Sequence, residues 1–234
     1  MQFLVSEEIF SLFPEACIGV VVAREVDNTR NVKEIADLLK DSSKRIYQKF
    51  KDASDYRSYS NIAVWRNAFK KCGINPNRHP SSIEALVKRV SRKPDFPSIN
   101  PVVDLVNALA LKHVLPMGAH DMDKLKGNLQ VRFSRKGDVF TPFGKKTHEE
   151  VEEGEIVYAD DEEIRTRRWI WRQGEKAKIT SESRNIFFPI DGFHGTTDNN
   201  VIKARDELAA LLENFFGCET RKLFVDINNP QVEL

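Results

Sequence analysis

Hydrophobic and polar residues follow two different periods along this chain. In the first half, apolar residues recur every three or four positions, which is the period of amphipathic helices. This spacing predicts helices over residues 31–52 and 59–72, a third that begins at the capping box Ser81-x-x-Glu84, and a fourth within residues 99–125. Before them, residues 16–24 (ACIGVVVAR) form a β-branched run that predicts a central strand packed on both faces.

After residue 125 the pattern changes to short alternating runs, which predict strands. The runs lie at residues 129–133, 139–140, 156–158, 168–172, 186–193 and 221–227. Pro189 interrupts one of them and predicts an edge strand or a bulge there. A further helix is expected over residues 198–216, with Asp198 as its cap and Gly217 at its end. Helices followed by strands, rather than alternating with them, indicate the α+β class.

The stretch at residues 99–125 carries the most unusual polar residues. Asn100 is a suitable N-cap and Pro101 a suitable first helical residue. Asn100, Asp104 and Asn107 then share one face of an otherwise apolar helix. Buried polar side chains need partners. We therefore expect either structural partners for this stripe or a ligand.

Composition narrows the class of protein. The 234 residues have a formal net charge of +1, so any contact with RNA must use a local patch. Three widely spaced cysteines indicate neither a disulfide framework nor a zinc knuckle and favour a reducing compartment. Neither a signal peptide nor a run of about 20 apolar residues is present, so we expect a cytoplasmic protein that does not bind membranes.

Two clusters are chemical candidates. The first joins the polar stripe to His120 and Asp121 in the turn after it. Ester hydrolysis needs an oriented water, an oxyanion cage and an anion for a substrate ammonium group, and these residue types supply them. The competing interpretation is that Asp104 and Asn107 cap neighbouring loops and that His120 is an ordinary hydrogen-bonded histidine.

The second cluster alternates arginine with tryptophan. Arginine pairs with phosphate and stacks on bases, so a strand carrying these residues can meet an RNA end. As a strand, residues 168–172 would present Arg168 and Arg172 on one face and both tryptophans on the other. The competing interpretation is that the arginines pair with the acidic residues 160–163. The cluster comprises Arg165, Arg167, Arg168, Trp169, Trp171 and Arg172.

The sequence contains no spacing typical of a metal site and no motif typical of a nucleotide site. His113, His120, Asp121 and Asp123 do not match a familiar zinc spacing. No P-loop, GxGxxG or Ser-His-Asp order occurs. We expect no metal and no cofactor.

An ordered series of segments resembles the B3/B4 domain of the phenylalanyl-tRNA synthetase β subunit over residues 59–193. The series runs INPVVDLVNALAL, LPMGAHDMDKL, LQVRFSRKGDVFTPFG, GEIVYAD, RRWIWRQ, KIT and NIFFPIDGF. The resemblance implies a layered fold with a mixed or antiparallel β-sandwich flanked by helices. We expect residues 1–234 to form a single such domain, with residues 1–58 and 194–234 belonging to it.

The resemblance also implies a function. In the synthetase this domain edits, hydrolysing tyrosine wrongly attached to tRNA. The length of this chain and its lack of a synthetase core lead us to expect a free-standing hydrolase that acts in trans on the 3′ end of mischarged aminoacyl-tRNA and has no DNA partner. The alternative is a non-catalytic module that binds an amino acid or tRNA.

Site residues follow by position. The family's histidine falls on Gly118 and its phenylalanine on His120, while its late-strand glutamate falls on Pro189, with Asp191 the nearest carboxylate. Arg172 and Gln173 replace small residues. These departures favour the binding alternative.

The expected roles divide into three groups. His120, Asp104 and Asp191 are the expected catalytic residues. Substrate-binding residues are expected to be Asn100, Asn107, Gly118, Ala119, Asp121 and Gln173, with the backbone amides near Gly118 and Ala119 stabilising the oxyanion. The expected RNA-binding residues are Arg168, Arg172 and Arg66.

Overall fold

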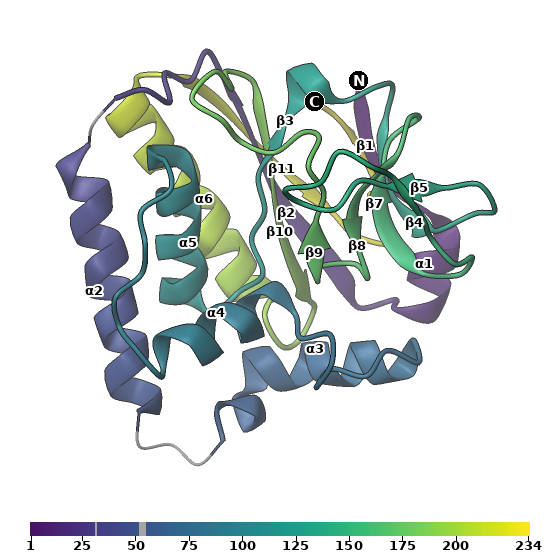
Figure 1. Ribbon diagram of the computed structural model, residues 1–234, viewed down its shortest axis with the longest axis horizontal. Coiled ribbons are helices and arrows are strands. Elements are labelled where there is room, and N and C mark those ends of the chain that lie inside the picture. The colour runs from purple at the N-terminus through teal and green to yellow at the C-terminus, as the bar shows by residue number, and fades with distance from the viewer. Residues whose placement is uncertain (31, 52–54) are drawn as a thin grey trace.

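The computed structural model describes residues 1–30, 32–51 and 55–234 and shows an α+β fold of three layers (Figure 1). A larger sheet packs on a smaller one, and helices cover the other face of the smaller sheet. The expected sandwich flanked by helices is confirmed. The helices are α1 (Glu7–Leu12), α2 (Lys33–Phe50), α3 (Ser60–Lys71), α4 (Ser82–Val90), α5 (Pro101–His113) and α6 (Asp198–Phe216).

The smaller sheet is antiparallel and has the order β11-β2-β10-β3. Its strands are β11 (Glu219–Val225), β2 (Ala16–Arg24), β10 (Ile186–Phe193) and β3 (His120–Asp121). Alternate residues of β2 face opposite layers: Val20 and Val22 pack toward the larger sheet, whereas Val21 and Ala23 pack toward α5 and α6. The β-branched run is therefore the central strand that its composition predicts.

The larger sheet has the order β12-β1-β4-β7-β8-β5-β6, with β9 pairing on β8. The β1–β4 and β5–β8 pairs are parallel and the others antiparallel. Its strands are β1 (Gln2–Val5), β4 (Leu129–Phe133), β5 (Val139–Phe140), β6 (Glu149–Glu150), β7 (Ile156–Ala159), β8 (Ile164–Arg167), β9 (Arg172–Gln173) and β12 (Gln231–Glu233). The two chain ends meet in this sheet, where Leu234 N–H donates to Met1 O over 3.0 Å.

The helix predictions are confirmed, apart from residues 31 and 52, which lie outside the described residues. The expected cap at Asp198 is wrong, because Thr197 is the N-cap of α6 and Asp198 is its first helical residue. Other local signals act as expected. Asn100 accepts a hydrogen bond from Val103 N–H over 3.0 Å at the start of α5, and Ser81 accepts one from Glu84 N–H at the start of α4. Gly217 ends α6 in the left-handed conformation.

Two strand predictions are wrong. Residues 168–171 form a turn between β8 and β9, and Arg168 and Trp169 have φ values of 47° and 61°. The five-residue alternation of RWIWR therefore does not exist. Strand β10 is not an edge strand, because it lies between β2 and β3. Pro189 fits there because its carbonyl, and so its missing N–H, faces the irregular residues 116–118 rather than β2.

Candidate functional site

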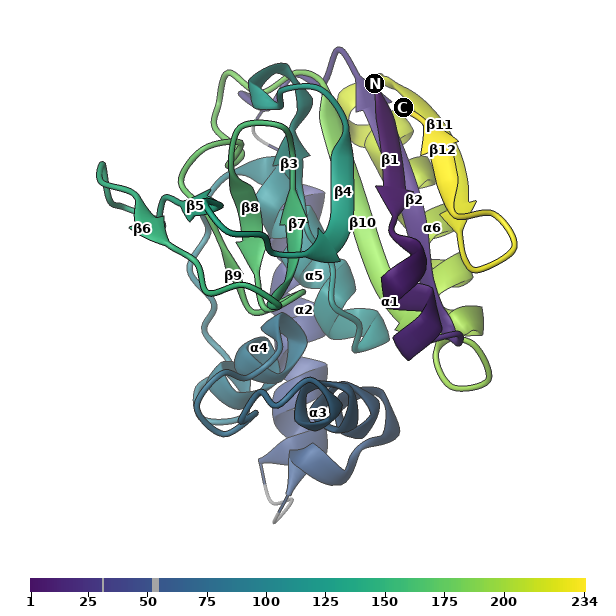
Figure 2. The same cartoon turned by 90° about the vertical axis from the view of Figure 1, so that its right-hand side faces the viewer.

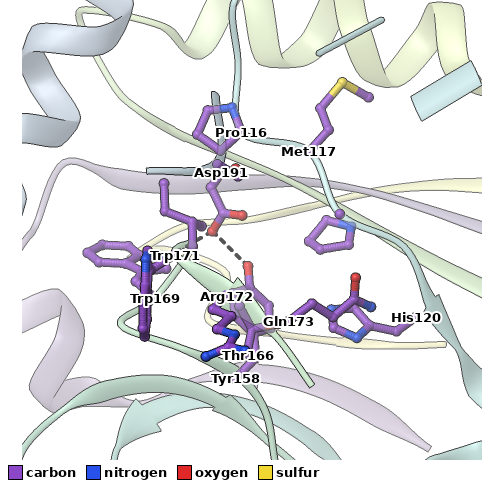
Figure 3. Close-up of a pocket in the computed structure, with 14 residues that line it drawn as sticks. Pro116, Met117, His120, Tyr158, Thr166, Trp169, Trp171, Arg172, Gln173 and Asp191 are labelled. Carbon is purple, nitrogen blue, oxygen red and sulfur yellow. Dashed lines mark hydrogen bonds between the residues drawn. The ribbon is translucent and has the colours of Figure 1, made fainter. Parts of the chain in front are cut away.

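A cavity of about 90 Å³ lies between the two sheets (Figure 3). Strand β10 and residues 116–120 form one wall, and β7, β8, β9 and the turn at residues 168–171 form the other. The N-terminus of α4 reaches the same cavity through Ser82. The lining residues are Ser82, Pro116, Met117, Gly118, His120, Tyr158, Thr166, Trp169, Ile170, Trp171, Arg172, Gln173, Pro189 and Asp191.

Register places His120 and Asp191 apart on one wall. His120 pairs with Phe187, and Asp191 N–H donates to Pro116 O over 3.1 Å. Asp191 lies four positions after Phe187, which is about 13 Å along an extended strand. The two side chains therefore approach the cavity from different ends.

Gly118 and Pro189 face each other between those ends. Gly118 N–H donates to Pro189 O over 3.0 Å, and a Cβ on Gly118 would lie 3.2 Å from Pro189 Cγ. A side chain at position 118 would also come within 3.9 Å of His120 Nε2. The expected use of the Gly118 amide as an oxyanion donor is wrong, because Pro189 already accepts its hydrogen.

Asp191 is a buried acid held by two donors. The Tyr158 hydroxyl donates to Oδ1 over 2.7 Å and Trp169 Nε1–H donates to the same oxygen over 3.0 Å (Figure 3). Burial raises the pKa of Asp191 to about 7, and both hydrogen bonds act against that rise. Among the described residues, none donates a hydrogen bond to Oδ2. That oxygen is available to a ligand.

His120 is a buried neutral base. Its ring lies 6.0 Å from that of Tyr158 and 6.2 Å from that of Phe187, measured between centroids. Burial, with a further contribution from the charge of Arg165, lowers the pKa of His120 to about 4. Its Nδ1 atom is buried and has no hydrogen-bond partner within the described chain. An unpartnered polar atom beside a cavity is a natural ligand contact.

The cavity mouth carries Arg172 and Gln173. Arg172 is exposed, its guanidinium lies 5.9 Å from the Trp171 ring centroid, and no described residue forms an ion pair with it. Gln173 Nε2 donates to Ala119 O over 2.8 Å, which ties β9 to the opposite wall. Of the residues expected at the site, the structure brings together His120, Asp191, Gly118, Gln173 and Arg172.

The polar stripe of α5 lies elsewhere. Asp104 accepts hydrogen bonds from Ser98 Oγ and, over 2.9 Å, from Ile99 N–H, while Asn100 caps its helix. The expected catalytic role of Asp104 is therefore not supported by its position, and neither are the substrate-binding roles of Asn100 and Asn107. For Asp104 the competing interpretation, a loop cap, is confirmed.

Asp121 also has a structural task. It accepts hydrogen bonds from Ser183 Oγ over 2.7 Å and from Asp123 N–H over 3.0 Å. It lies beyond the cavity lining, so the expected contact with substrate is not supported. His113 pairs with Glu207 over 2.8 Å. The described residues contain no group of three or more potential metal ligands.

Most of the arginine cluster is paired. Arg165 is fully buried and pairs with Asp160 and Glu163. Arg167 and Arg168 pair with Glu155, which lies outside the acidic run expected to hold them.

Arg66 is paired in the same way. Its guanidinium pairs with Glu84, whose side chain is 4% exposed. Of the three expected RNA-binding arginines, only Arg172 is unpaired within the described chain.

Tyr158 and Thr166 are site residues that sequence reasoning did not identify, and Trp169 was singled out only as part of the arginine–tryptophan cluster, not as a partner of Asp191. A signal existed for Tyr158 and Trp169, because a buried tyrosine hydroxyl or indole N–H requires a partner. Tyr158 lies in a strand that is buried throughout, IVYA. Its partner lies 33 positions away, which no sequence spacing indicates.

Comparison with known proteins gives one family. A family model for the B3/4 domain matches residues 64–217. The phenylalanine–tRNA ligase β subunit of Fusobacterium nucleatum is 24% identical over 212 residues, which cover 88% of this chain and 25% of that protein. The same subunit of Idiomarina loihiensis is 32% identical over 96 residues, which cover 41% of this chain and 12% of that protein.

A solved structure was also found. It is an N-terminal fragment of the phenylalanyl-tRNA synthetase β subunit of Pyrococcus horikoshii, with a TM-score of 0.49 and 11% identity, covering 95% of this chain and 53% of that one. The chain thus spans about a quarter or less of the length of the two curated relatives. No helix in the described residues is long and apolar enough to cross a membrane.

Proposed function

The chain belongs to the B3/4 domain family, and from this membership and the cavity together we propose that it hydrolyses the ester of mischarged aminoacyl-tRNA in trans. The observation that carries the proposal is the buried Asp191, whose pKa of about 7 leaves it partly ionised at neutral pH and whose Oδ2 is available to a ligand. The related proteins are phenylalanine–tRNA ligase β subunits, whose names contain the substrate class.

In this proposal Asp191 binds the substrate. Its Oδ2 accepts hydrogens from the α-ammonium group of the aminoacyl ester. A bound cation favours the carboxylate and lowers the pKa of Asp191, so binding selects the ionised form. Tyr158 and Trp169 hold the carboxylate in position, which reduces the entropy lost when substrate binds.

His120 acts on water. Because its pKa of about 4 keeps the imidazole neutral, one ring nitrogen accepts a hydrogen bond from the attacking water. The water oxygen adds to the ester carbonyl carbon, the bond to the ribose oxygen breaks, and the ribose hydroxyl takes up the proton. Arg172 at the mouth contacts the terminal phosphate or ribose.

Deacylation of a panel of mischarged tRNAs tests the proposal. We expect release of at least one amino acid well above the spontaneous rate, and loss of that activity in Asp191→Asn. Asp104→Asn is the matched control, since it makes the same chemical change outside the cavity. If every pair is hydrolysed only at the spontaneous rate, the proposal is wrong.

One observation favours a second candidate, in which the cavity binds an amino acid or an aminoacyl end without cleaving it. A histidine with a pKa of about 4 is a weak base, since general-base efficiency falls with pKa. Calorimetric binding of an amino acid that His120→Ala leaves unchanged, with no deacylation, would support this candidate. No binding would reject it.

A further inference from the structure

Charge is strongly segregated along this nearly neutral chain. Residues 44–93 hold 13 lysines and arginines but only 3 aspartates and glutamates. The rest of the chain holds 23 lysines and arginines and 32 aspartates and glutamates. The segment therefore carries a formal charge of +10 and the remainder −9. A net charge of +1 conceals this division.

The basic segment is one compact part of the fold. It comprises the second half of α2 together with α3 and α4, which lie side by side below the sheets in Figure 2. We call the described residues 44–51 and 55–93 the helical lobe. Its interior is apolar, with Ile46, Phe50, Ile62, Ile83 and Val87 in one cluster with residues of α5. The positive side chains other than Arg66 lie on its outer surface.

Most of these cations lack an acidic partner. Within the described residues, the lobe's ion pairs join Arg57 to Asp55, Arg66 to Glu84 and Lys93 to Asp95. The exposed lysines and arginines with no ion pair in the described chain are Lys44, Arg45, Lys49, Lys70, Lys71, Arg78, Lys88, Arg89 and Arg92. Such a field of like charges opposes folding and is typical of a surface that meets a polyanion.

The chemistry of the surface favours RNA over a membrane. Interfacial helices insert large apolar side chains beside their lysines. The exposed large hydrophobic residues among the described ones all lie outside the lobe, namely Met1, Ile99, Phe143, Ile202 and Ile227. Phosphate contacts by lysine and arginine require no such residues.

The lobe is continuous with the cavity. Ser82 lines the cavity and begins α4, and its N–H donates to Ile170 O over 2.9 Å. Lys88 lies six residues further along the same helix, or about 9 Å along its axis. A strand whose end enters the cavity therefore passes the basic surface within a few nucleotides.

We propose that the helical lobe binds the phosphate backbone of tRNA. The choice of tRNA as the ligand rests on the proposed function. The inference that this surface binds a polyanion rests only on its positive charge. Arg172 then contacts only the 3′ end of the tRNA. Most of the binding energy comes from the lobe helices α2, α3 and α4, which lie outside the arginine–tryptophan cluster.

The test measures binding of uncharged tRNA, which has no ester to cleave, by fluorescence anisotropy between 50 and 200 mM salt. The variant Lys44→Gln/Lys70→Gln/Lys88→Gln removes one exposed cation from each helix. We expect at least about tenfold weaker binding at low salt, and a salt slope of log affinity reduced by about 2, since each phosphate contact contributes roughly 0.7 to 0.9.

The matched control is Lys136→Gln/Lys203→Gln/Arg221→Gln, which removes the same charge from exposed sites outside the lobe. It should bind within about twofold of the parent, and circular dichroism should show both variants folded. Equal losses in the two variants, or no loss in the lobe variant, would overturn the proposal.

Two other outcomes are distinguishable. If the protein does not deacylate any tRNA but binds tRNA through the lobe, the proposed function is wrong and this inference holds. Binding to vesicles containing phosphatidylserine, but not to tRNA, would overturn the inference in favour of a membrane surface.

Discussion

Tyr158 on β7 and Asp191 on β10 form a hydrogen bond of 2.7 Å that joins the two sheets inside the cavity. The bond lowers the pKa of Asp191 against the effect of burial. Burial raises the pKa of Tyr158 well above its usual value, and the charge and hydrogen bond of the Asp191 carboxylate raise it further. Each group thus shifts the pKa of the other, in addition to the larger effect of burial.

Tyr158→Phe should raise the pKa of Asp191 above its present value of about 7. The ring packing is retained, but the ionised carboxylate loses a donor worth about 1 to 2 kcal/mol, or roughly one pKa unit. Carbon-13 NMR titration of the carboxyl group measures it. A pKa that stays constant or falls would show that the Tyr158 hydroxyl does not stabilise the ionised carboxylate.

Asp191→Asn should change how stability depends on pH. The folded pKa of about 7 lies above the unfolded value of about 3.9, so the native state holds more protons between these values and loses stability as pH rises through them. Asparagine still accepts from Tyr158 and Trp169 and has no such loss. Urea unfolding should therefore show a variant that gains on the parent by a few kcal/mol from pH 4 to pH 8. A constant difference across that range would contradict the raised pKa.

His120→Phe should keep or raise stability and abolish hydrolysis. Its unpartnered Nδ1 is removed while the ring contacts with Tyr158 and Phe187 are retained, which is worth about 1 kcal/mol.

Stability at acidic pH distinguishes the His120→Phe variant from the parent. The folded pKa of His120, about 4, lies below the unfolded value of about 6.5, so the parent loses stability as pH falls between them. Thermal unfolding at pH 4.5 and pH 7.5 should show the larger gain at pH 4.5. Unchanged deacylation would remove His120 from the mechanism.

Asp104→Ala should destabilise the protein by about 1 to 2 kcal/mol and leave deacylation unchanged. Its carboxylate holds Ser98 and the Ile99 amide at the start of α5, so the loss is that of a cap rather than of a ligand. Denaturant unfolding and the deacylation rate measure the two effects separately. Loss of deacylation with unchanged stability would show that Asp104 acts at the functional site.

Arg172→Gln should weaken substrate binding without affecting the fold. The side chain is exposed and has no ion-pair partner in the described chain, so the melting temperature should stay within about 1 °C. The KM for aminoacyl-tRNA should rise severalfold while kcat changes little. An unchanged KM would place the RNA end elsewhere.

Local sequence determines a large part of this molecule. The helices follow from apolar spacing, and the caps Asn100, Ser81 and Gly217 act within their own turns, where no distant residue is needed. The uniform apolar run at residues 16–24 demands burial on both faces, and β2 is a central strand for that reason. The segregation of charge is also written in the sequence, although the net charge hides it.

Tertiary structure alone decides which polar residues meet. Asp104 and Asp191 are both buried carboxylates, yet one closes a loop six residues away, and the other meets Tyr158 from another sheet and Trp169 from the turn between β8 and β9. The turn at residues 168–171 defeats the alternation of RWIWR because two left-handed residues turn Trp169 into the core. Sequence spacing specifies neighbours along an element. The register between β10 and residues 116–121 specifies the cavity, because pairing across a sheet joins residues that no local period relates.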